Sequence, residues 1–376
     1  MKIIVNTRLL ISHKLSGLGW FTFHTLQRMV KAHPEHQFIF LFDRPYEEQF
    51  IFGPNVIPEV AFPPTRHPLL VYLWLEYALP GIFKKHKPDA FFSPDGFLSL
   101  KMKEIPSVPV IHDLNFEHYP SDLPFADRTF YKRYIPKYAR MARRIITVSE
   151  FSKNDINRLY HIPLDKIDVA YNGASEIFAP VSVDIKQQIK SELTANCDFF
   201  VAIGDLLPRK NIARLLQAYE LFKDQTGSNV KLVIVGQKLF HTSEIERTYQ
   251  QSKYRDEIVF TGRLSNEKLK EVLASALSLV YVSYFEGFGI PLVEAMYADV
   301  PVITSNVTAM PEVAGNAALL VDPFSTNSIA DAMQQIFKDG NLRTELINKG
   351  RLRRESFHWD HTAMKIWQSI EKAVNA

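Results

Sequence analysis

The stretch "LSLVYVSYFEGFGIPLVEAM", residues 277–296, contains a complete strand–loop–helix unit. Its first six residues are mostly apolar, with β-branched and aromatic side chains, which is typical of a strand covered on both faces of a sheet. The Gly-Phe-Gly turn then ends the strand, and Pro291 is suited to the first turn of a helix. The stretch therefore predicts an α/β fold in which polar groups follow the end of a parallel strand.

The same alternation of strands and helices extends along the whole chain. Strands are predicted at 2–5, 38–42, 90–92, 108–111, 145–148 and 168–170 in the first half, and at 199–204, 230–236, 258–260, 277–282, 300–304 and 317–321 in the second. Helical spacing is found at 19–32, 151–159, 211–223, 243–254, 265–275, 291–298 and 326–338. Strands joined through helices imply right-handed crossovers and two doubly wound parallel sheets.

The length of 376 residues indicates two domains. The segment 175–193 mixes prolines with charges and contains no clean strand, so we predict a linker there. The last segment, 358–376, predicts a helix with Trp359, Met364, Trp367 and Ile370 on one apolar face. The predicted domains are 1–178, 190–356 and a C-terminal helix at 357–376.

The composition is that of a soluble globular protein, with 46% hydrophobic and 23% charged residues. A single cysteine, Cys197, excludes an internal disulfide, so we expect a reducing compartment, the cytoplasm. The first residues lack the apolar length of a signal peptide, and the apolar stretch 68–83 is short and charged enough to be a buried helix. The net charge is only +3, and we expect no nucleic-acid partner.

The loop and helix of the opening stretch carry groups that suit a nucleotide. Gly287 and Gly289 allow backbone N–H groups to approach a diphosphate at a helix N-terminus. Glu294 could accept hydrogen bonds from a ribose diol, and Glu286 could reach a sugar hydroxyl. The structural alternative is a loop carboxylate at Glu286 and a first-turn residue favourable to the helix dipole at Glu294.

A second motif, which contains two cations, is "GDLLPRKN", residues 204–211. Gly204 ends a strand, and Arg209 and Lys210 precede a helix that Asn211 is suited to cap. Two cations at this place suit a departing diphosphate, Arg through forked hydrogen bonds and Lys as a point charge. Solvated surface charges are the alternative.

Three weaker signals follow other strands. Gly236 and Arg263 lie in strand-end turns, for which a purely structural role is the simpler interpretation. The stretch "SGLGWFT" (16–22), with Gly17 and Gly19, predicts a flexible glycine loop over a ligand. Thr22 stands where an NAD-binding fingerprint needs its third glycine, which argues against a dinucleotide.

In the first half, His112 and Asp113 follow a strand directly. The histidine could act as a base or bind a sugar hydroxyl, with Asp113 holding its ring, although a structural histidine is the alternative. Ser149 is expected to cap the next helix.

The segment 128–144 predicts a basic amphipathic helix containing Pro136. Its cationic stripe is Arg133, Lys137, Arg140 and Arg144, and its apolar stripe is Phe130, Tyr134, Tyr138 and Met141. Such a helix could contact an anionic membrane or an anionic acceptor, or it could simply be a solvated face.

Several catalytic signatures are absent from the sequence. It contains no D-x-D, H-E-x-x-H, P-loop or G-x-S-x-G motif. We therefore expect no metal and no cofactor, with cations and backbone amides supplying the electrostatics.

Taken in order, these motifs resemble the family-four retaining glycosyltransferases of the GT-B fold. The likeness rests on "VIHDL" (110–114), "TVSEFSKNDI" (147–156), "YNG" (171–173), "GDLLPRKN", "EGFGIPLVEAM" and "PVITSNVTAMPEVAGNAALLVDP" (301–323), and it spans nearly the whole chain. Within the family, the chain is most similar to bacterial mannosyl- or glucosyltransferases of polysaccharide and lipopolysaccharide synthesis.

The resemblance implies a role for each matching residue. Arg209 and Lys210 would bind the donor diphosphate and stabilise the leaving nucleotide, and Glu294 would hold the ribose. Glu286, with the backbone of Phe288, Gly289 and Ile290, would hold the donor sugar and phosphates. His112 would lie beside the transferred sugar, and the Gly17–Gly19 loop near the phosphate or acceptor. Asp205 departs from the family, many of whose members have an arginine there.

The resemblance also implies two Rossmann-like domains facing a cleft, with the C-terminal helix returning to the first domain. The predicted function is the metal-independent, retaining transfer of a hexose, mannose or glucose, from a GDP- or UDP-sugar to a glycan or lipid-linked acceptor. A sugar-nucleotide epimerase and a catalytically silent binding module are the alternatives. We expect a cytoplasmic protein, with 128–144 a candidate for peripheral membrane contact.

Overall fold

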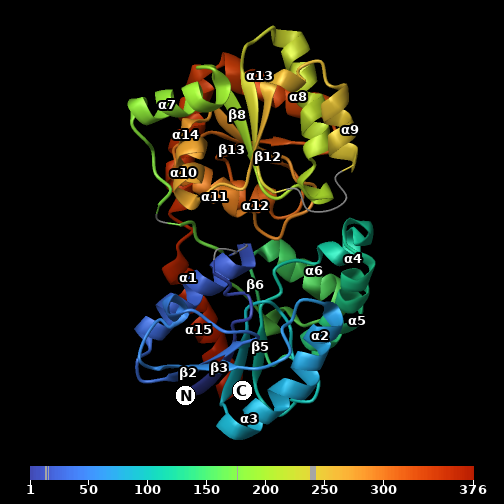
Figure 1. Ribbon diagram of the computed structural model, residues 1–376, viewed down its shortest axis with the longest axis vertical. Helices are drawn as coiled ribbons and strands as arrows, with labels where there is room; N and C mark the ends of the chain where they lie inside the picture. The colour runs from blue at the N-terminus through green and yellow to red at the C-terminus, as the bar shows by residue number, and fades with distance from the viewer. Residues whose placement is uncertain (13–14, 16, 176, 238–242) are drawn as a thin grey trace. The chain divides into compact units, whose positions relative to one another are not determined.

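The computed structural model describes residues 1–12, 15, 17–175, 177–237 and 243–376, which form two compact units (Figure 1). The first unit comprises Met1–Asn172 with His358–Ala376, and the second comprises Gly173–Phe357. Each unit is an α/β domain built on a parallel sheet, as the alternating pattern predicts. The fold is thus of the GT-B class, with two Rossmann-like domains.

Among the described residues, the sheet of the first unit has five parallel strands in the order β3-β2-β1-β4-β5. These strands are β1 (Lys2–Asn6), β2 (Gln37–Phe42), β3 (Val56–Val60), β4 (Ala90–Ser93) and β5 (Ser107–Pro109). Strand β3 was not predicted because it contains Pro58, which lacks an N–H donor. The proline is tolerated since β3 is an edge strand.

Helices surround this sheet, and a two-stranded parallel sheet extends the unit. The additional strands are β6 (Ile145–Thr147) and β7 (Ile167–Val169). The helical elements are α1 (Gly17–Ala32), η1 (Glu48–Phe50), α2 (Pro68–Leu73), the π-helical turn η2 (Trp74–Ala78), α3 (Leu79–His86), α4 (Asn115–His118), η3 (Pro120–Asp122), α5 (Phe125–Met141), α6 (Glu150–Tyr160), η4 (Leu164–Lys166) and α15 (Trp359–Asn375). Ser149 caps α6 as predicted, because its side chain accepts a hydrogen bond from the backbone N–H of Ser152.

In the second unit, the described residues form a six-stranded parallel sheet in the order β10-β9-β8-β11-β12-β13. Its strands are β8 (Phe199–Ile203), β9 (Lys231–Val235), β10 (Ile258–Gly262), β11 (Ser278–Tyr281), β12 (Val302–Ser305) and β13 (Ala318–Val321). The helical elements are α7 (Val183–Thr194), η5 (Pro208–Lys210), α8 (Ile212–Thr226), α9 (Ser243–Gln251), η6 (Arg255–Glu257), α10 (Asn266–Ser275), α11 (Ile290–Tyr297), α12 (Met310–Ala314), α13 (Thr326–Lys338) and α14 (Gly340–Arg354).

The predicted linker at 175–193 is wrong for its second half, which forms α7. Ser182 caps this helix through a hydrogen bond from Ile185, and Ile189 is buried. The helix packs against α10, so its few apolar residues gain a partner that the local sequence does not reveal. The second unit accordingly begins at Gly173 rather than at residue 190.

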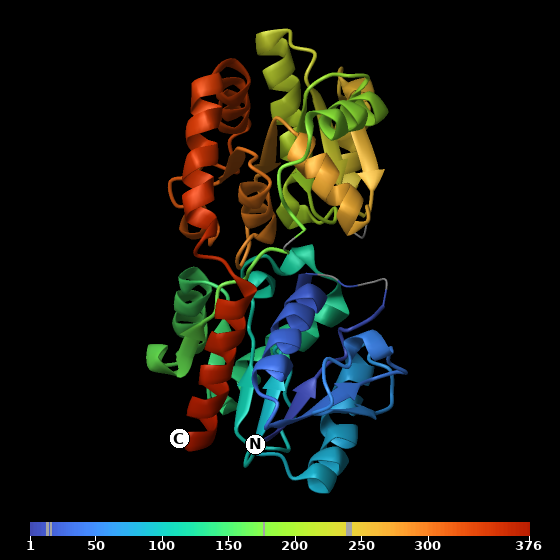
Figure 2. The same ribbon diagram turned by 90° about the vertical axis from the view of Figure 1, so that its left-hand side faces the viewer.

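The C-terminal helix α15 belongs to the first unit, although residues 173–357 separate it from the rest of that unit in sequence. It packs against α1, and Figure 2 shows the two helices (red and blue) side by side. Trp359, Trp367 and Ile370 are buried, as predicted. Met364 is 47% exposed, so its place on the apolar face was wrong.

The basic segment forms α5, with Pro136 inside the helix. Arg144 lies beyond the last residue of α5. It forms a bidentate ion pair with Asp168 of β7, with Nε 2.7 Å from Oδ2 and Nη2 2.9 Å from Oδ1. The predicted cationic stripe is therefore limited to Arg133, Lys137 and Arg140, which are exposed. No helix within the described ranges has both the length and the apolarity needed to cross a bilayer.

Candidate active site

The strongest cluster of polar groups lies at the carboxyl end of the second unit's sheet. Strands β8 and β11 are neighbours, so the loops that follow them, 204–211 and 282–289, emerge at the same edge. Within these loops, Arg209 Nη1 lies 2.6 Å from Glu286 Oε2, and Lys210 Nζ lies 2.6 Å from Glu286 Oε1. Three of the residues predicted for the site are thus brought together across 76 residues of sequence.

Tyr281, the last residue of β11, completes this ion-pair cluster. Its hydroxyl lies 3.0 Å from Glu286 Oε1 and accepts a hydrogen bond from Lys210 Nζ at 2.5 Å. Tyr281 was not among the residues predicted for the site. Its position at the end of a strand, immediately before the glycine loop, is a signal that could have found it.

The electrostatics of the cluster depend on its pairing. Burial alone would raise the pKa of Glu286, but Arg209 and Lys210 hold it at about 2. Burial and the charge of Glu286 raise the pKa of Tyr281 well above its usual value, so its hydroxyl stays neutral and donates to the carboxylate. Two cations and one carboxylate give the cluster a net charge of +1, which favours an anionic ligand.

Gly204 makes room for the lysine of this cluster. Its φ is +138°, and a Cβ there would lie 3.1 Å from Lys210 Cε. A side chain at this position would displace Lys210 from Glu286. Gly204 therefore supports the cluster through its lack of a side chain.

The loop before α11 presents backbone rather than side chains. Gly287 and Gly289 are buried, and among the described residues their N–H groups have no hydrogen-bond partner. Gly289 adopts a φ of +92°, and a Cβ there would lie 2.6 Å from Met310 Cε, so the loop requires glycine. The Phe288 ring is buried against Phe357, at 5.5 Å between centroids. Only the backbone of residues 287–290 is thus suited to bind a ligand, at the start of an eight-residue helix.

Glu294 contrasts with Glu286. Its carboxyl is partly buried and makes no hydrogen bond to the described residues, and burial raises its pKa to about 8. The first turn of α11 contains no acidic residue, so the dipole interpretation of Glu294 was wrong. A protonated carboxyl at neutral pH can both donate and accept a hydrogen bond.

Asn211 occupies the N-cap position of α8, as predicted, but its φ is +62° and its side chain makes no capping hydrogen bond. Instead, its amide donates to the carbonyl groups of Val282 (3.0 Å) and Pro323 (2.7 Å). Asn211 therefore ties the Arg209–Lys210 loop to the end of β11.

The remaining predicted residues of this unit do not join the cluster. Gly236 donates its N–H to the carbonyl of Gly262 at 3.1 Å, so this amide is used between strand ends. Arg263 follows directly and is exposed. Asp205, the departure from the family, accepts a hydrogen bond from the backbone N–H of Gln237 at 3.1 Å.

His112 belongs to the first unit, at the carboxyl end of its sheet. Its Nε2–H donates to the carbonyl of Pro94 at 2.8 Å, which leaves Nδ1 as an acceptor. Burial lowers the pKa of His112, so the ring is neutral. Asp113 was predicted to hold this ring, which is wrong: it accepts from the backbone N–H of Asn115 at 2.9 Å.

The predicted glycine loop in this unit is also wrong in its conformation. Gly17 and Gly19 lie in the first turn of α1 rather than in a loop, and Ser16 lies outside the described residues. Gly19 is buried, and a Cβ there would lie 3.1 Å from the carbonyl oxygen of Leu9. Gly19 therefore allows the first turn of α1 to lie close to the backbone of Leu9.

A polar network that the sequence did not reveal also lies at this edge of the first unit. The Asp95 side chain is buried and accepts hydrogen bonds from Arg8 Nε (2.5 Å), Asn6 Nδ2 (2.8 Å) and Ser93 Oγ (2.9 Å). Asn6 and Ser93 end neighbouring strands, and ligands of doubly wound sheets bind at such ends.

Comparisons with known proteins agree with this architecture. Residues 15–176 match the family model described as Glycosyltransferase Family 4, and residues 184–353 match that described as Glycosyl transferases group 1. The chain is 26% identical over 375 residues to O-antigen chain mannosyltransferase B of Escherichia coli, covering 96% of this chain and 97% of the relative. It is 28% identical over 226 residues to O-antigen chain mannosyltransferase RfbU of Salmonella typhimurium, covering 60% and 59%.

Solved structures share the fold over the full length. Sucrose-phosphate synthase from Thermosynechococcus elongatus has a TM-score of 0.77 and 19% identity, with 99% of this chain and 98% of that chain covered. Anabaena HepE in complex with UDP-glucose has a TM-score of 0.76 and 18% identity, with 99% and 100% covered. Each of the two α/β units is built on a parallel sheet, and a glycosyltransferase family model matches each of them. The chain therefore belongs to the glycosyltransferases, with a family 4 domain followed by a group 1 domain.

Proposed function

We propose that the chain transfers a hexose, with mannose favoured, from a nucleoside-diphosphate sugar to a hydroxyl of a glycan or lipid-linked acceptor. The observation that carries the proposal is the convergence of Arg209 and Lys210 on Glu286 beside the glycine loop of α11. Mannose and a role in O-antigen or lipopolysaccharide synthesis are supported by the names of the two relatives. A nucleotide-sugar donor is supported by HepE, which was solved with UDP-glucose.

In the proposed complex, the diphosphate lies against the ion-pair cluster and the loop amides. Arg209 and Lys210 exchange part of their contact with Glu286 for phosphate oxygens, and the N–H groups of Gly287 and Gly289 point to the same anion. Glu294 binds the ribose diol by donating one hydrogen bond and accepting another.

The proposed reaction retains the anomeric configuration. The acceptor oxygen forms a bond to the sugar C1 on the face from which the diphosphate leaves, while the bond from C1 to the phosphate oxygen breaks. The departing phosphate oxygen takes the acceptor proton, so no side-chain nucleophile is needed. Arg209 and Lys210 stabilise the negative charge that develops on the diphosphate, without a metal ion or cofactor.

The decisive experiment incubates the purified protein with GDP-mannose, UDP-glucose, UDP-galactose or UDP-N-acetylglucosamine and a mannose-terminated acceptor. We expect transfer from GDP-mannose, with proton NMR showing the same anomeric configuration in donor and product, and no loss of rate with chelator. Turnover of the nucleotide sugar without an acceptor would instead indicate an epimerase. Binding of a donor without turnover would indicate a silent module.

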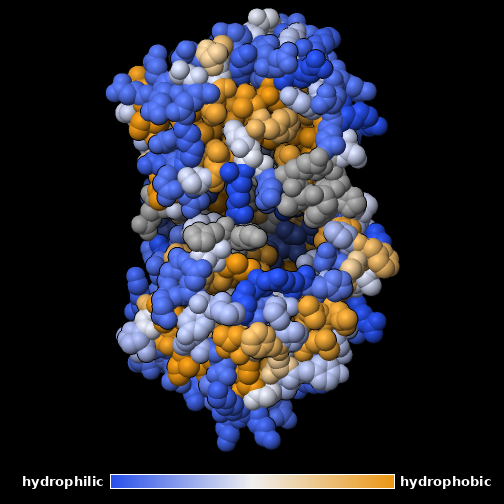
Figure 3. All heavy atoms as spheres, viewed as in Figure 1, coloured by the Kyte–Doolittle hydropathy of each residue, from blue (hydrophilic) through white to orange (hydrophobic). Residues whose placement is uncertain are grey.

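We also propose that α5 brings the protein to an anionic membrane at the cytoplasmic face. Arg133, Lys137 and Arg140 are exposed on this helix, and exposed apolar side chains lie on it and on the neighbouring α2 and η2. These apolar side chains are Leu69 of α2, Tyr77 of η2 and Phe125 of α5, with exposed fractions of 59%, 64% and 73%. Figure 3 shows apolar atoms (orange) at the surface in the region of α2. Cations interspersed with exposed apolar groups suit the headgroup region of anionic lipids.

Flotation with vesicles tests this contact. We expect the protein to float with phosphatidylglycerol-containing vesicles and not with neutral ones, and the double variant Arg133→Glu, Lys137→Glu to stay at the bottom. The charge-matched control is Lys253→Glu, Lys349→Glu in the second unit. Equal flotation of both double variants would refute a specific role for α5.

A further inference from the structure

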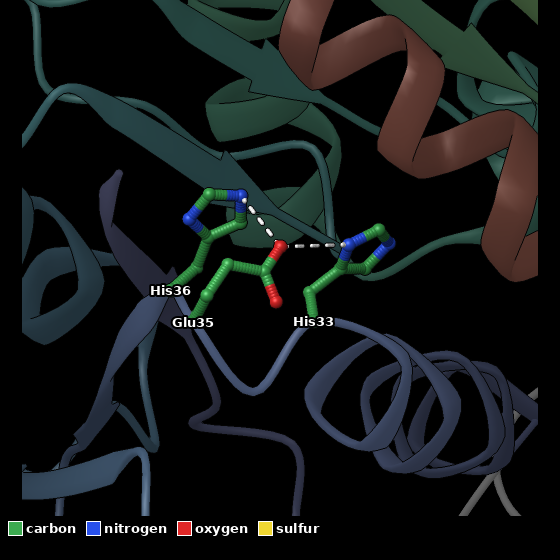
Figure 4. A group of neighbouring side chains, drawn as sticks. All are labelled: His33, Glu35 and His36. Carbon is green, nitrogen blue, oxygen red and sulfur yellow. Dashed lines mark ion pairs between the residues drawn. The ribbon is translucent and has the colours of Figure 1, made fainter.

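The turn between α1 and β2 brings two histidines and a glutamate together, in the sequence His33-Pro34-Glu35-His36. Glu35 Oε1 lies 3.6 Å from His33 Nδ1 and 3.2 Å from His36 Nε2. Figure 4 shows the carboxylate oxygen between the two imidazole rings. The three atoms all lie within 4.8 Å of one another, although none of these residues was singled out from the sequence.

We propose that this turn binds one divalent transition-metal ion, of which Zn²⁺ is the reference, through His33 Nδ1, Glu35 Oε1 and His36 Nε2. Bonds of about 2.0–2.1 Å in a tetrahedral site place ligand atoms roughly 3.3–3.4 Å apart. The two distances from Glu35 Oε1, 3.2 and 3.6 Å, lie on either side of this value. Two imidazoles and one carboxylate suit Zn²⁺, Ni²⁺ or Cu²⁺ rather than Mg²⁺ or Ca²⁺.

The backbone of the turn is held in place before any ion binds. Asn55 Nδ2 lies near three carbonyl oxygens around the turn, those of Val30 (3.2 Å), His33 (3.1 Å) and His36 (3.1 Å). The N–H of His36 also donates to the carbonyl of His33 at 3.2 Å. Because both histidine backbones are fixed, little conformational entropy is lost when their rings take up an ion.

The imidazole rings are oriented by a tryptophan from α15. Trp367 stacks on His33, with 3.7 Å between ring centroids and 15° between planes, and on His36, at 5.0 Å and 20°. These contacts all lie within the first unit. They restrict ring rotation, which is the function that outer-shell groups serve in metal sites.

Access is also suitable. The His33 and His36 side chains are 25% and 20% exposed, and that of Glu35 is 60% exposed, so a hydrated ion can enter. His36 Nδ1 lies 2.8 Å from the Met1 amine, and this contact leaves Nε2 on the side of Glu35.

The role inferred for the ion is structural. The ion fixes the His33 and His36 rings, which stack on Trp367 of α15. It thereby strengthens the docking of α15 on α1. The proposal is independent of sugar transfer, since the ion takes no part in the reaction. An ion-pair network of Glu35 with protonated histidines is the competing explanation of the same distances.

Calorimetry with zinc chloride separates the two explanations. With the untagged full chain, freed of metal by chelator, we expect one saturable site at neutral pH and a higher melting temperature with Zn²⁺. His33→Asn and His36→Asn should each weaken binding by about 10-fold or more. Glu35→Gln should weaken it as well, and this exposed change leaves the fold intact.

His86→Asn is the matched control. His86 pairs with Glu59 at 3.2 Å, but the second partner of that carboxylate is Lys85 rather than another imidazole. This variant should bind Zn²⁺ like the wild type. Absence of saturable binding, or unchanged affinity in both Glu35→Gln and His33→Asn, would overturn the proposal.

Copper chloride gives an independent readout. Cu²⁺ quenches tryptophan fluorescence at short range, and Trp367 is the tryptophan stacked on His33. We expect saturable quenching in the wild type, its loss in Trp367→Phe and a shift to higher Cu²⁺ concentration in Glu35→Gln, with Trp20→Phe as the control. An unchanged quenching curve in Glu35→Gln would place the ion elsewhere and refute the site.

Discussion

Two glutamates of one loop–helix unit, Glu286 in the loop before α11 and Glu294 within α11, have opposite protonation states. Burial raises the pKa of each, yet Glu286 has a pKa of about 2 and Glu294 of about 8. The difference lies in their partners: Arg209 and Lys210 contact Glu286, whereas Glu294 has no hydrogen bond to the part of the chain that the structure describes. Pairing, rather than burial, decides which carboxyl is charged here.

The comparison also separates two roles for the same residue type. Glu286 holds two cations in a fixed arrangement, which is the electrostatic preorganisation that the proposed diphosphate leaving group requires. The carboxyl of Glu294 makes no hydrogen bond to the described residues, which suits the ribose diol of the proposed donor. Four substitutions can break or sharpen this contrast.

The largest effect is expected from Lys210→Ala, which removes one of the cations that distinguish Glu286 from Glu294. We expect turnover to fall about 100- to 1,000-fold, because a stabilising charge at the leaving group is lost. Steady-state kinetics measure it, with circular dichroism checking the fold. Lys253→Ala, which breaks an exposed pair with Asp224, is the control. Unchanged turnover in Lys210→Ala would remove the diphosphate assignment.

Glu286→Gln removes the negative charge of Glu286, the ionised one of the two glutamates. Arg209 and Lys210 then lose their counter-charge in a largely buried site, and we expect the free energy of unfolding to fall by about 3 kcal/mol. Urea denaturation at pH 7 measures this loss. The exposed pair Glu345–Lys349 supplies the control, since Glu345→Gln should change stability by at most about 0.5 kcal/mol. Equal effects at both sites would contradict the contrast between paired and exposed carboxylates.

Glu294→Gln tests the raised pKa. A carboxyl with a pKa near 4.5 when unfolded and about 8 when folded stabilises the protein below pH 4.5, and this stability is lost as the pH rises to 8. From pH 6 to pH 8, the wild type should therefore lose on the order of 2 kcal/mol relative to the variant. Denaturation across this range measures it. Parallel pH profiles would show that Glu294 is ionised throughout.

The smallest effect is expected from Tyr281→Phe. It removes the hydroxyl shared by Glu286 and Lys210 but leaves their 2.6 Å ion pair intact. We expect a loss of about 1 kcal/mol in the free energy of unfolding, typical of one hydrogen bond. A loss as large as that of Glu286→Gln would mean that the tyrosine, rather than the cations, fixes the carboxylate.

Much of the fold was predictable from local patterns. Runs such as "VKLVIVG" (230–236) are apolar and β-branched, and they form strands because both of their faces are covered by helices. The edge strand β3 was missed because Pro58 contradicts a central strand, and only its place in the sheet order shows why it is allowed. The helix α7 was missed because its apolar contact is with α10, which follows far along the chain.

For the site, the sequence predicted which residues lie at strand ends but not which groups their side chains contact. Arg209, Lys210 and Glu286 were expected at strand ends, and parallel topology brings such ends to one edge. The contacts expected for the side chains of Asn211 and Asp113 were wrong: Asn211 donates to distant carbonyl groups, and Asp113 accepts from the nearby N–H of Asn115. The local sequence favours a capping bond for the Asn211 side chain, whereas the folded chain offers it the carbonyl groups of Val282, directly after β11, and of Pro323.

The sequence by itself determined the succession of strands and helices and the family-typical motifs at strand ends, since periodicity and turn chemistry act over a few residues. Only the tertiary structure decided that Glu286 is a carboxylate and Glu294 a protonated acid, that Tyr281 joins the cluster, and that Trp367 stacks on His33. These properties depend on the burial of each side chain and on the groups that distant segments bring near it. Both are set only when the chain has folded.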